Sequence, residues 1–123
     1  MRDLFRSPVV YAQLFKNRIR LSVPAKGVVV EEHGTFSHPR SLIGQFQEGE
    51  LALARALAKA YPTKLLTRRP RMVIHAKELL DGGLTQIEER ALMEMGLGAG
   101  AMKVKIWQGA DLSPQQLEEV ARK

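Results

Sequence analysis

The stretch TQIEERALMEMGLGAGAMKVKIW, residues 85–107, contains a helix signal, a run of alternate glycines and a strand signal in that order. Thr85 and Glu88 have the spacing of a capping box, which predicts that a helix begins at Thr85. Lysines alternate with apolar residues over 103–107, a pattern typical of a half-buried strand. The glycines therefore close a helix and precede a strand.

The position of these glycines argues against a nucleotide-binding loop. Phosphate cradles place their glycines between a strand and the next helix, where free backbone N–H groups face the phosphate. A helix C-terminus presents carbonyl oxygens and partial negative charge instead. We expect Gly96 or Gly98 to be the left-handed residue after the helix, and Gly100 to permit entry into the strand. The stretch predicts a turn and no bound cofactor.

Further helix and strand signals lie on both sides of this stretch. Gln47–Tyr61 has apolar residues every four positions and ends at Pro62, which predicts a helix. The apolar run Met72–His75 predicts a short buried strand. Ser113 and Gln116 repeat the capping-box spacing ahead of a short last helix. The inner stripe expected for the helix that begins at Thr85 is Ile87, Ala91 and Met95.

The first third of the chain predicts three strands. Pro8–Val23 is interpreted as a hairpin with a turn at Lys16-Asn17, and its second arm alternates apolar and basic residues. Val28–Val30 predicts a third short strand. The sequence thus predicts an α/β fold, with three leading antiparallel strands and then α-β-α-β-α in one mixed sheet. We expect a single domain over 1–123, with residues 1–7 flexible or peripheral.

Composition restricts the setting and the class of partner. The 123 residues include no cysteine, which excludes disulfides and favours the cytoplasm. No apolar run approaches the ~20 residues that span a bilayer. The formal net charge of +6 favours anionic partners: nucleic acid, an acidic protein surface or anionic lipid. Met1, Leu4 and Phe5 alternate with basic residues, so weak peripheral membrane contact is a minor hypothesis.

The densest basic cluster is the connector after the first helix, joined by two arginines of the hairpin. A cluster of this kind is either a solvated connector, which we favour, or a contact for nucleic acid or acidic protein. The residues are Arg18, Arg20, Lys64, Arg68, Arg69 and Arg71.

Other chemistry-bearing residues do not converge in the sequence pattern. His33 and His38 lack metal-ligand spacing, and we expect His75 to be satisfied by backbone at a strand end. Glu31 and Glu32 are adjacent on a strand and point in opposite directions, so we expect a solvated strand end. We therefore predict no catalytic, cofactor-binding or metal-binding residues.

Several motifs over about residues 40–107 resemble the bacterial actin-like family, in particular its rod-shape-determining MreB members. They are an Arg-Pro-Arg lead into a strand at 69–71, a Thr-Gln-x-Glu helix start at Thr85, an Ala-Gly-Ala turn at 99–101 and a segment at 43–46 before the first helix. The resemblance implies an RNase-H-like, actin-type half fold. It also implies a protein partner, either an actin-like filament protein or a second copy of the chain, in a cell-shape or filament system.

The sequence departs from this family where the family binds and hydrolyses ATP. The hairpin at 11–17 has no glycine, hydroxyl or acidic metal-anchoring residue, and Gln108, Gly109 and Ala110 stand where the family has an acidic pair and proline. None of these three side chains is a general base. We also expect the second domain to be missing. The expected function is a non-catalytic pseudo-ATPase domain acting through protein contacts, and the alternative is a basic nucleic-acid-binding module.

Overall fold

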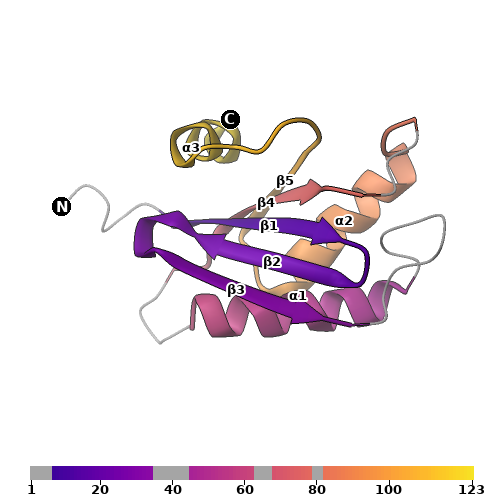
Figure 1. Cartoon of the computed structure of the whole chain (residues 1–123), viewed down its shortest axis with the longest axis horizontal. Coiled ribbons are helices and arrows are strands. Elements are labelled where there is room, and N and C mark those ends of the chain that lie inside the picture. The colour runs from indigo at the N-terminus through magenta and orange to yellow at the C-terminus, as the bar shows by residue number, and fades with distance from the viewer. Residues whose placement is uncertain (1–6, 35–44, 63–67, 79–81) are drawn as a thin grey trace.

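A five-stranded mixed sheet forms the centre of the molecule (Figure 1). The computed structural model describes residues 7–34, 45–62, 68–78 and 82–123. The strands occur in the order β3-β2-β1-β4-β5 across the sheet. The elements in chain order are β1 (Val9–Phe15), β2 (Arg18–Val23), the 3-10 turn η2 (Pro24–Lys26), β3 (Val28–His33), α1 (Phe46–Ala60), β4 (Arg71–Ala76), α2 (Gln86–Ala99), β5 (Lys103–Trp107) and α3 (Pro114–Arg122).

The strand pairings confirm the predicted mixed sheet. β1, β2 and β3 form an antiparallel meander, in which Phe15 pairs with Arg18 next to the first turn. Asn17 lies in that turn with a φ of 52°, a left-handed conformation that asparagine tolerates better than most residues. β4 then pairs parallel to β1, and β5 parallel to β4. The predicted order β-β-β-α-β-α-β-α is therefore confirmed.

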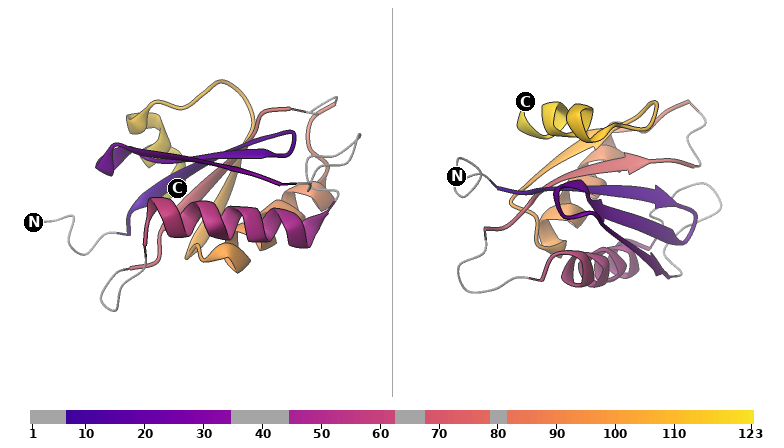
Figure 2. Two further views of the ribbon diagram at one scale, coloured as in Figure 1. Left: turned by 60° about the horizontal axis from the view of Figure 1, so that its bottom comes forward. Right: turned by 60° about the vertical axis from the view of Figure 1, so that its left-hand side comes forward.

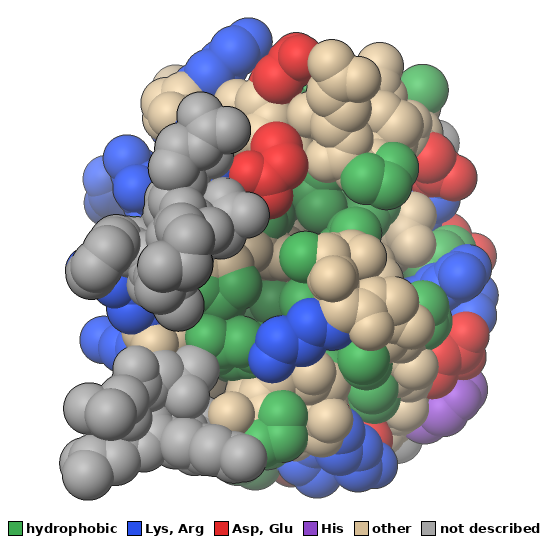
Figure 3. Space-filling view, turned by 90° about the vertical axis from the view of Figure 1, so that its left-hand side faces the viewer, with side chains coloured by type: hydrophobic (Ala, Val, Ile, Leu, Met, Phe, Trp, Pro, Cys, Tyr) green, Lys and Arg blue, Asp and Glu red, His purple; other side chains and the backbone are tan. Residues whose placement is uncertain are grey.

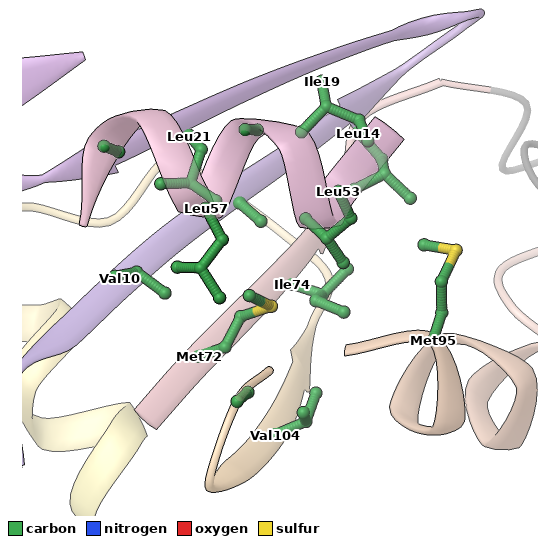
Figure 4. Packing of buried hydrophobic residues seen from close by; sticks show 14 of the residues in the cluster. Val10, Leu14, Ile19, Leu21, Leu53, Leu57, Met72, Ile74, Met95 and Val104 are labelled. Carbon is green, nitrogen blue, oxygen red and sulfur yellow. The ribbon is translucent and has the colours of Figure 1, made fainter. Parts of the chain in front are cut away.

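Helices lie on both sides of the sheet. The right-hand view of Figure 2 shows α1 and α2 on one side and α3 on the other. The larger core lies under α1 and α2, where the sheet contributes alternate residues and the helices contribute apolar stripes (Figure 4). Full burial of one such large side chain contributes about 1.5–3 kcal/mol. The labelled core residues are Val10, Leu14, Ile19, Leu21, Leu53, Leu57, Met72, Ile74, Met95 and Val104.

α1 buries the stripe that its four-residue repeat predicts. Leu53 and Leu57 are buried, as is Tyr61 directly after the helix, and the helix occupies 46–60 where the sequence predicted 47–61. The face beside β3 carries an interaction that the sequence did not predict. Glu32 of β3 is only 7% exposed and is paired with Arg55 at 3.0 Å and with Lys59. The expectation of a solvated strand end is correct for Glu31 and wrong for Glu32, because Glu32 points toward α1.

α2 begins as predicted and ends later than predicted. Thr85 Oγ1 accepts a hydrogen bond from the Glu88 N–H at 3.1 Å, and the Glu88 carboxylate accepts one from the Thr85 N–H at 2.9 Å. The helix then continues through both predicted end glycines to Ala99. Gly100 is the capping residue, with a φ of 127°. The expectation that Gly96 or Gly98 ends the helix is therefore wrong.

Gly96 has a packing role inside α2. A Cβ atom at this position would lie 2.7 Å from Val104 Cγ2 and 3.2 Å from Ile74 Cδ1, so the helix approaches the sheet closely there. This close approach places Leu92 and Met95 toward the core and turns Ile87 outward, where it is 82% exposed. The predicted inner stripe is thus correct for Met95 and wrong for Ile87.

α3 covers a smaller core on the opposite face of the sheet. Its capping box joins Ser113 and Gln116 as predicted. Leu117 and Ala121 pack against Val9, Tyr11 and Val73. Arg122 Nη2 donates to the carbonyl of Ser7 at 2.8 Å, so the last helix is fastened to the segment that precedes β1. None of the helices in the described ranges is both long enough and apolar enough to cross a membrane.

Candidate functional site

The five predicted basic residues that the structure describes do not form one cluster. Arg18 pairs with Phe15 at the end of β1, whereas Arg71 pairs with Val9 at its beginning. Because a strand rises about 3.3 Å per residue, the seven residues of β1 separate these two groups by about 20 Å. Lys64 lies outside the described residues, as do His38, Met1, Leu4 and Phe5. The basic residues therefore divide between the two ends of the sheet.

The arginines at the amino end of the sheet contact helix ends. Arg69 donates to the carbonyls of Gly100 and Ala101 at 3.2 and 2.9 Å, which closes the turn between α2 and β5. Arg71 Nη1 lies 3.4 Å from the carbonyl of Ala121 in α3. Cations near helix C-termini are stabilising because the last carbonyls are partly negative. Arg68 is exposed, and Figure 3 shows this end of the molecule, where hydrophobic side chains gather at the centre and Lys and Arg side chains lie around them.

The hairpin arginines lie on the face of the sheet that also carries α3. The Arg18 guanidinium lies 4.0 Å from the centroid of the Phe15 ring and 3.4 Å from the Glu31 carboxylate. Arg20 is exposed and is paired in register with Gln13 on one side and Glu31 on the other. These neighbours make the hairpin surface mixed in charge rather than purely basic.

A second polar group lies at the carboxyl ends of β1 and β4. We call it the carboxyl-end cluster: Tyr11, Gln13, His75, Lys77 and Asp111. Ligands of open α/β sheets bind outside the carboxyl ends of the strands, so this is the position where a site is expected. The alternation of β1 and β4 turns the first three side chains toward the α3 face, and the loop between β5 and α3 brings Asp111 over them. Register and loop closure bring this cluster together.

His75 is buried, and both of its ring nitrogens are occupied. Nε2 lies 2.9 Å from the Gly109 carbonyl, which can only accept, so Nε2 carries the proton. Nδ1 therefore accepts from the Tyr11 hydroxyl at 2.5 Å, and that hydroxyl in turn accepts from the Leu112 N–H at 3.2 Å. Burial lowers the pKa of His75 and raises the pKa of Tyr11, which keeps both groups neutral. The pair holds the loop between β5 and α3 onto the sheet.

Asp111 forms the exposed side of the carboxyl-end cluster. Its Oδ1 accepts hydrogen bonds from Lys77 and, at 3.3 Å, from Gln13 Nε2. The contact with Lys77 lowers the pKa of Asp111. Its nearest approach to His75 Nδ1 is 4.0 Å, too long for a hydrogen bond, and that nitrogen already accepts from Tyr11. The ranges that the structure describes contain no group of three His, Cys, Asp or Glu side chains placed to hold a metal ion.

Sequence reasoning found one member of this cluster and missed the others. His75 was expected to be satisfied by backbone, and its contact with Gly109 agrees with that expectation. Its second partner, Tyr11, comes from 64 positions away in the chain. The sequence signal that could have found Tyr11 and Gln13 is the two-residue alternation of strand side chains, which places both of them on one face of β1. The contribution of Asp111 depends on the path of a loop, which has no periodic signal.

The hairpin turn after β1 and the segment 108–110 have structural contacts of their own. The hairpin turn after Phe15 is a tight turn, and the Lys16 N–H donates to the Glu78 carboxylate at 2.5 Å. Gln108 Oε1 accepts from the Leu84 N–H at 3.1 Å, and the Trp107 indole donates to the Ala110 carbonyl at 2.9 Å. These contacts stabilise loops at the carboxyl end of the sheet.

The chain is a small α/β domain. Its five-stranded mixed sheet carries the three helices of the described chain, and the carboxyl-end cluster lies on the α3 face. Uncharacterized protein YjaA from Escherichia coli (strain K12) is 32% identical to the chain over 102 residues, which cover 79% of this chain and 80% of that protein. The chain belongs to the YjaA family. No family model matches the sequence.

Proposed function

We propose that this protein is a non-catalytic, actin-like domain of RNase-H-like architecture that acts through contacts with other proteins in the cytoplasm. In this proposal it is a pseudo-ATPase: it has the scaffold of one half of an actin-type ATPase without the phosphate loops. Its partner is a protein of a filament or cell-shape system, or a second copy of the chain.

The sheet topology supports the architecture. The resemblance to the bacterial actin-like family implies three antiparallel strands followed by a parallel extension of the same sheet. The order β3-β2-β1-β4-β5, with β4 and β5 parallel to β1, has this form. The family-like motifs at 69–71, 85–91 and 99–101 lie at the start of β4, at the start of α2 and at the turn into β5.

The carboxyl-end cluster is the observation that carries the non-catalytic part of the proposal. Both ring nitrogens of His75 are occupied, and the Asp111 carboxylate is paired with Lys77. A general base must be within hydrogen-bond reach of a substrate proton and must be free to accept it. The contacts at this position instead hold a loop onto the sheet.

An open part of the sheet supports action through protein contacts. On the α3 face, α3 packs on β1, β4 and β5 in the described chain. The outward side chains of β2 and β3 are more accessible: Val29 is 54% exposed, and the side chain of His33 is 72% exposed. An accessible sheet face of mixed charge with an exposed valine is suited to contact with another protein.

The proposal predicts that the protein does not bind ATP. Isothermal titration calorimetry with ATP and Mg²⁺ is expected to show no binding heat beyond dilution, because the phosphate-binding groups are replaced. ADP and GTP, titrated in the same buffer, are expected to give the same result. Measurable ATP binding at micromolar affinity would contradict the non-catalytic proposal.

The nucleic-acid alternative has less support. Arg69 is bonded to two backbone carbonyls, and Arg18 lies at the opposite end of β1 from Arg71. Phosphate contacts require several free cations along one surface, and they weaken steeply as salt rises. An oligonucleotide shift that is absent, or that does not respond to salt, would remove this alternative.

A further inference from the structure

The edge of the sheet formed by β5 is unpaired within the part of the chain that the structure describes. In the described chain β5 pairs with β4 on one side, and no strand lies on its other side. An edge strand presents backbone N–H and C=O groups that can bind an additional extended segment. The strand is short and carries two lysines, which discourages uncontrolled pairing and selects the charge of whatever binds.

Three side chains of β5 point toward the α3 face. Strand alternation places Lys103, Lys105 and Trp107 on this face, whereas Val104 belongs to the core on the other side. Lys103 is exposed and Lys105 is half-buried. Arg71 of β4 is the register neighbour of Lys103 and adds a further positive charge. The edge is therefore basic at its beginning and aromatic at its end.

A pocket of about 230 Å³ lies beside the aromatic end of this edge. The Trp107 indole N–H is already bonded to the Ala110 carbonyl, so the ring offers the pocket apolar contact rather than a donor. Polar side chains of α3 surround the apolar surface. The residues that matter here are Trp107, Leu112, Gln116, Glu119, Val120 and Lys123.

We propose that β5 and the adjoining side of α3 bind an extended acidic segment of a partner protein as a sixth strand of the sheet. An apolar side chain of the segment enters the pocket beside Trp107. Because side chains on one face of a strand repeat every two residues, the next two on that face lie opposite Lys105 and Lys103 and are acidic. The recognised pattern is apolar-x-acidic-x-acidic if the segment runs antiparallel to β5, and acidic-x-acidic-x-apolar if it runs parallel.

Charge complementarity identifies the occupant. The β5 strand has two lysines and no acidic residue, with Arg71 and Lys123 nearby. Glu119 and Asp111 both line the pocket, where they disfavour an acidic side chain and so favour an apolar one at that position. This inference rests on the proposed function, because it specifies the chemistry of the protein partner.

The test uses two blocked peptides, Glu-Thr-Glu-Thr-Phe and its reverse, titrated into the full chain at low ionic strength. Trp107 is the single tryptophan of the chain, so its fluorescence emission reports on the pocket directly. One of the two peptides is expected to produce a saturable change in emission. The absence of a saturable change with both peptides would overturn the inference.

Two double variants test whether the peptide binds at β5 or is held by the general positive charge of the protein. Lys103→Glu with Lys105→Glu is expected to weaken the peptide at least about tenfold, since two opposed charge pairs become repulsive. The matched control, Lys16→Glu with Lys26→Glu, makes the same change in net charge at exposed positions in the connections between β1, β2 and β3, which β4 separates from β5, and should alter binding by less than about twofold. Equal weakening by both pairs would overturn the inference. Circular dichroism checks folding, and Lys103→Gln with Lys105→Gln serves as a milder second variant.

A modified peptide tests strand addition without altering the protein. Methylation of alternate backbone nitrogens keeps every charge and removes the N–H donors of a strand, so binding should weaken at least about tenfold. Unchanged affinity of the methylated peptide would overturn strand addition. Displacement of the peptide by an equal concentration of single-stranded oligonucleotide would instead assign the surface to nucleic acid.

The two proposals fail in distinguishable ways. Peptide binding together with micromolar ATP binding would remove the non-catalytic proposal and leave the edge-strand site. If the protein binds neither the peptides nor ATP, the edge-strand site is refuted and the non-catalytic proposal stands.

Discussion

The Tyr11 hydroxyl has two partners in the core beneath α3. It donates to His75 Nδ1 and accepts from the Leu112 N–H, so one side chain connects β1, β4 and the loop before α3. Water cannot fully replace the hydroxyl at His75, since Tyr11 and His75 are 6% and 1% exposed. Removing one partner from a buried hydrogen bond costs more than the bond itself contributes, because the other partner stays unsatisfied.

Tyr11→Phe is therefore expected to lower the free energy of unfolding by about 1–3 kcal/mol. Urea denaturation followed by circular dichroism measures this change. The other tyrosine of the chain supplies the control, because the Tyr61 hydroxyl donates to a single backbone acceptor among the described residues, the Arg68 carbonyl. Tyr61→Phe is expected to cost less, about 0.5–1.5 kcal/mol. A larger loss for Tyr61→Phe than for Tyr11→Phe would contradict the account of the His75 contacts.

At the scale of elements, the close contact of α2 with the sheet depends on a glycine, Gly96, which has no Cβ atom. Gly96 lies against Val104 and Ile74, and it sets which face of the helix is buried. Glycine inside a helix normally costs about 1 kcal/mol relative to alanine, so its presence here has to be explained by packing. The sequence pattern alone favoured Ile87 for the inner stripe, because a period of four cannot show where the backbone approaches most closely.

Gly96→Ala is expected to destabilise the protein by about 1–3 kcal/mol despite the better helix propensity of alanine. The new Cβ would lie 2.7 Å from Val104 Cγ2, within the packed core. Thermal and urea unfolding measure the loss. Gly98→Ala is the matched control, because its Cβ would meet only the end of the flexible Glu50 side chain. We expect the control to be close to neutral or slightly stabilising, and a Gly96→Ala protein as stable as the control would refute the close-approach explanation.

At the scale of the whole molecule, two buried titratable groups make stability depend on pH in the same direction. Lys59 and Arg55 lower the pKa of Glu32 from its ordinary value of 4.5, so its contribution is present above pH 4.5 and is lost as pH falls through the folded pKa. Burial lowers the pKa of His75 from 6.5, and the unfolded chain therefore takes up a proton first as pH falls below 6.5. Both effects reduce stability in acid.

Glu32→Gln is expected to reduce the free energy of unfolding by about 1–2 kcal/mol at pH 7, because Glu32 connects the edge strand β3 to α1 through two cations. The difference from the unchanged protein should shrink below pH 4.5, where the native carboxylate is also progressively protonated. Urea unfolding at pH 7, 5 and 3.5 measures both effects. A difference that is the same at all three pH values would show that the ion pairs do not produce it.

The sequence predicted the elements well and the contacts between them poorly. Capping boxes at Thr85 and Ser113 and the alternation of β2 are local signals, and the structure confirms each of them. The carboxyl-end cluster and the Glu32 ion pairs join residues distant in the chain, and no local period encodes them. The separation of Arg18 from Arg71 also depends on strand register, which composition does not contain.

The central position of β1 has a consequence for synthesis. β1 emerges from the ribosome before β2, β3 and β4, and the meander of β1, β2 and β3 can pair as soon as β3 has been made. The other edge of β1 stays bare until β4 has been made, since Tyr11 meets its partner His75 only 64 positions later. Exposed strand edges in incomplete chains promote aggregation, and long-range parallel pairing is slow. A nascent chain that stalls before β4 is therefore the form most in need of a chaperone.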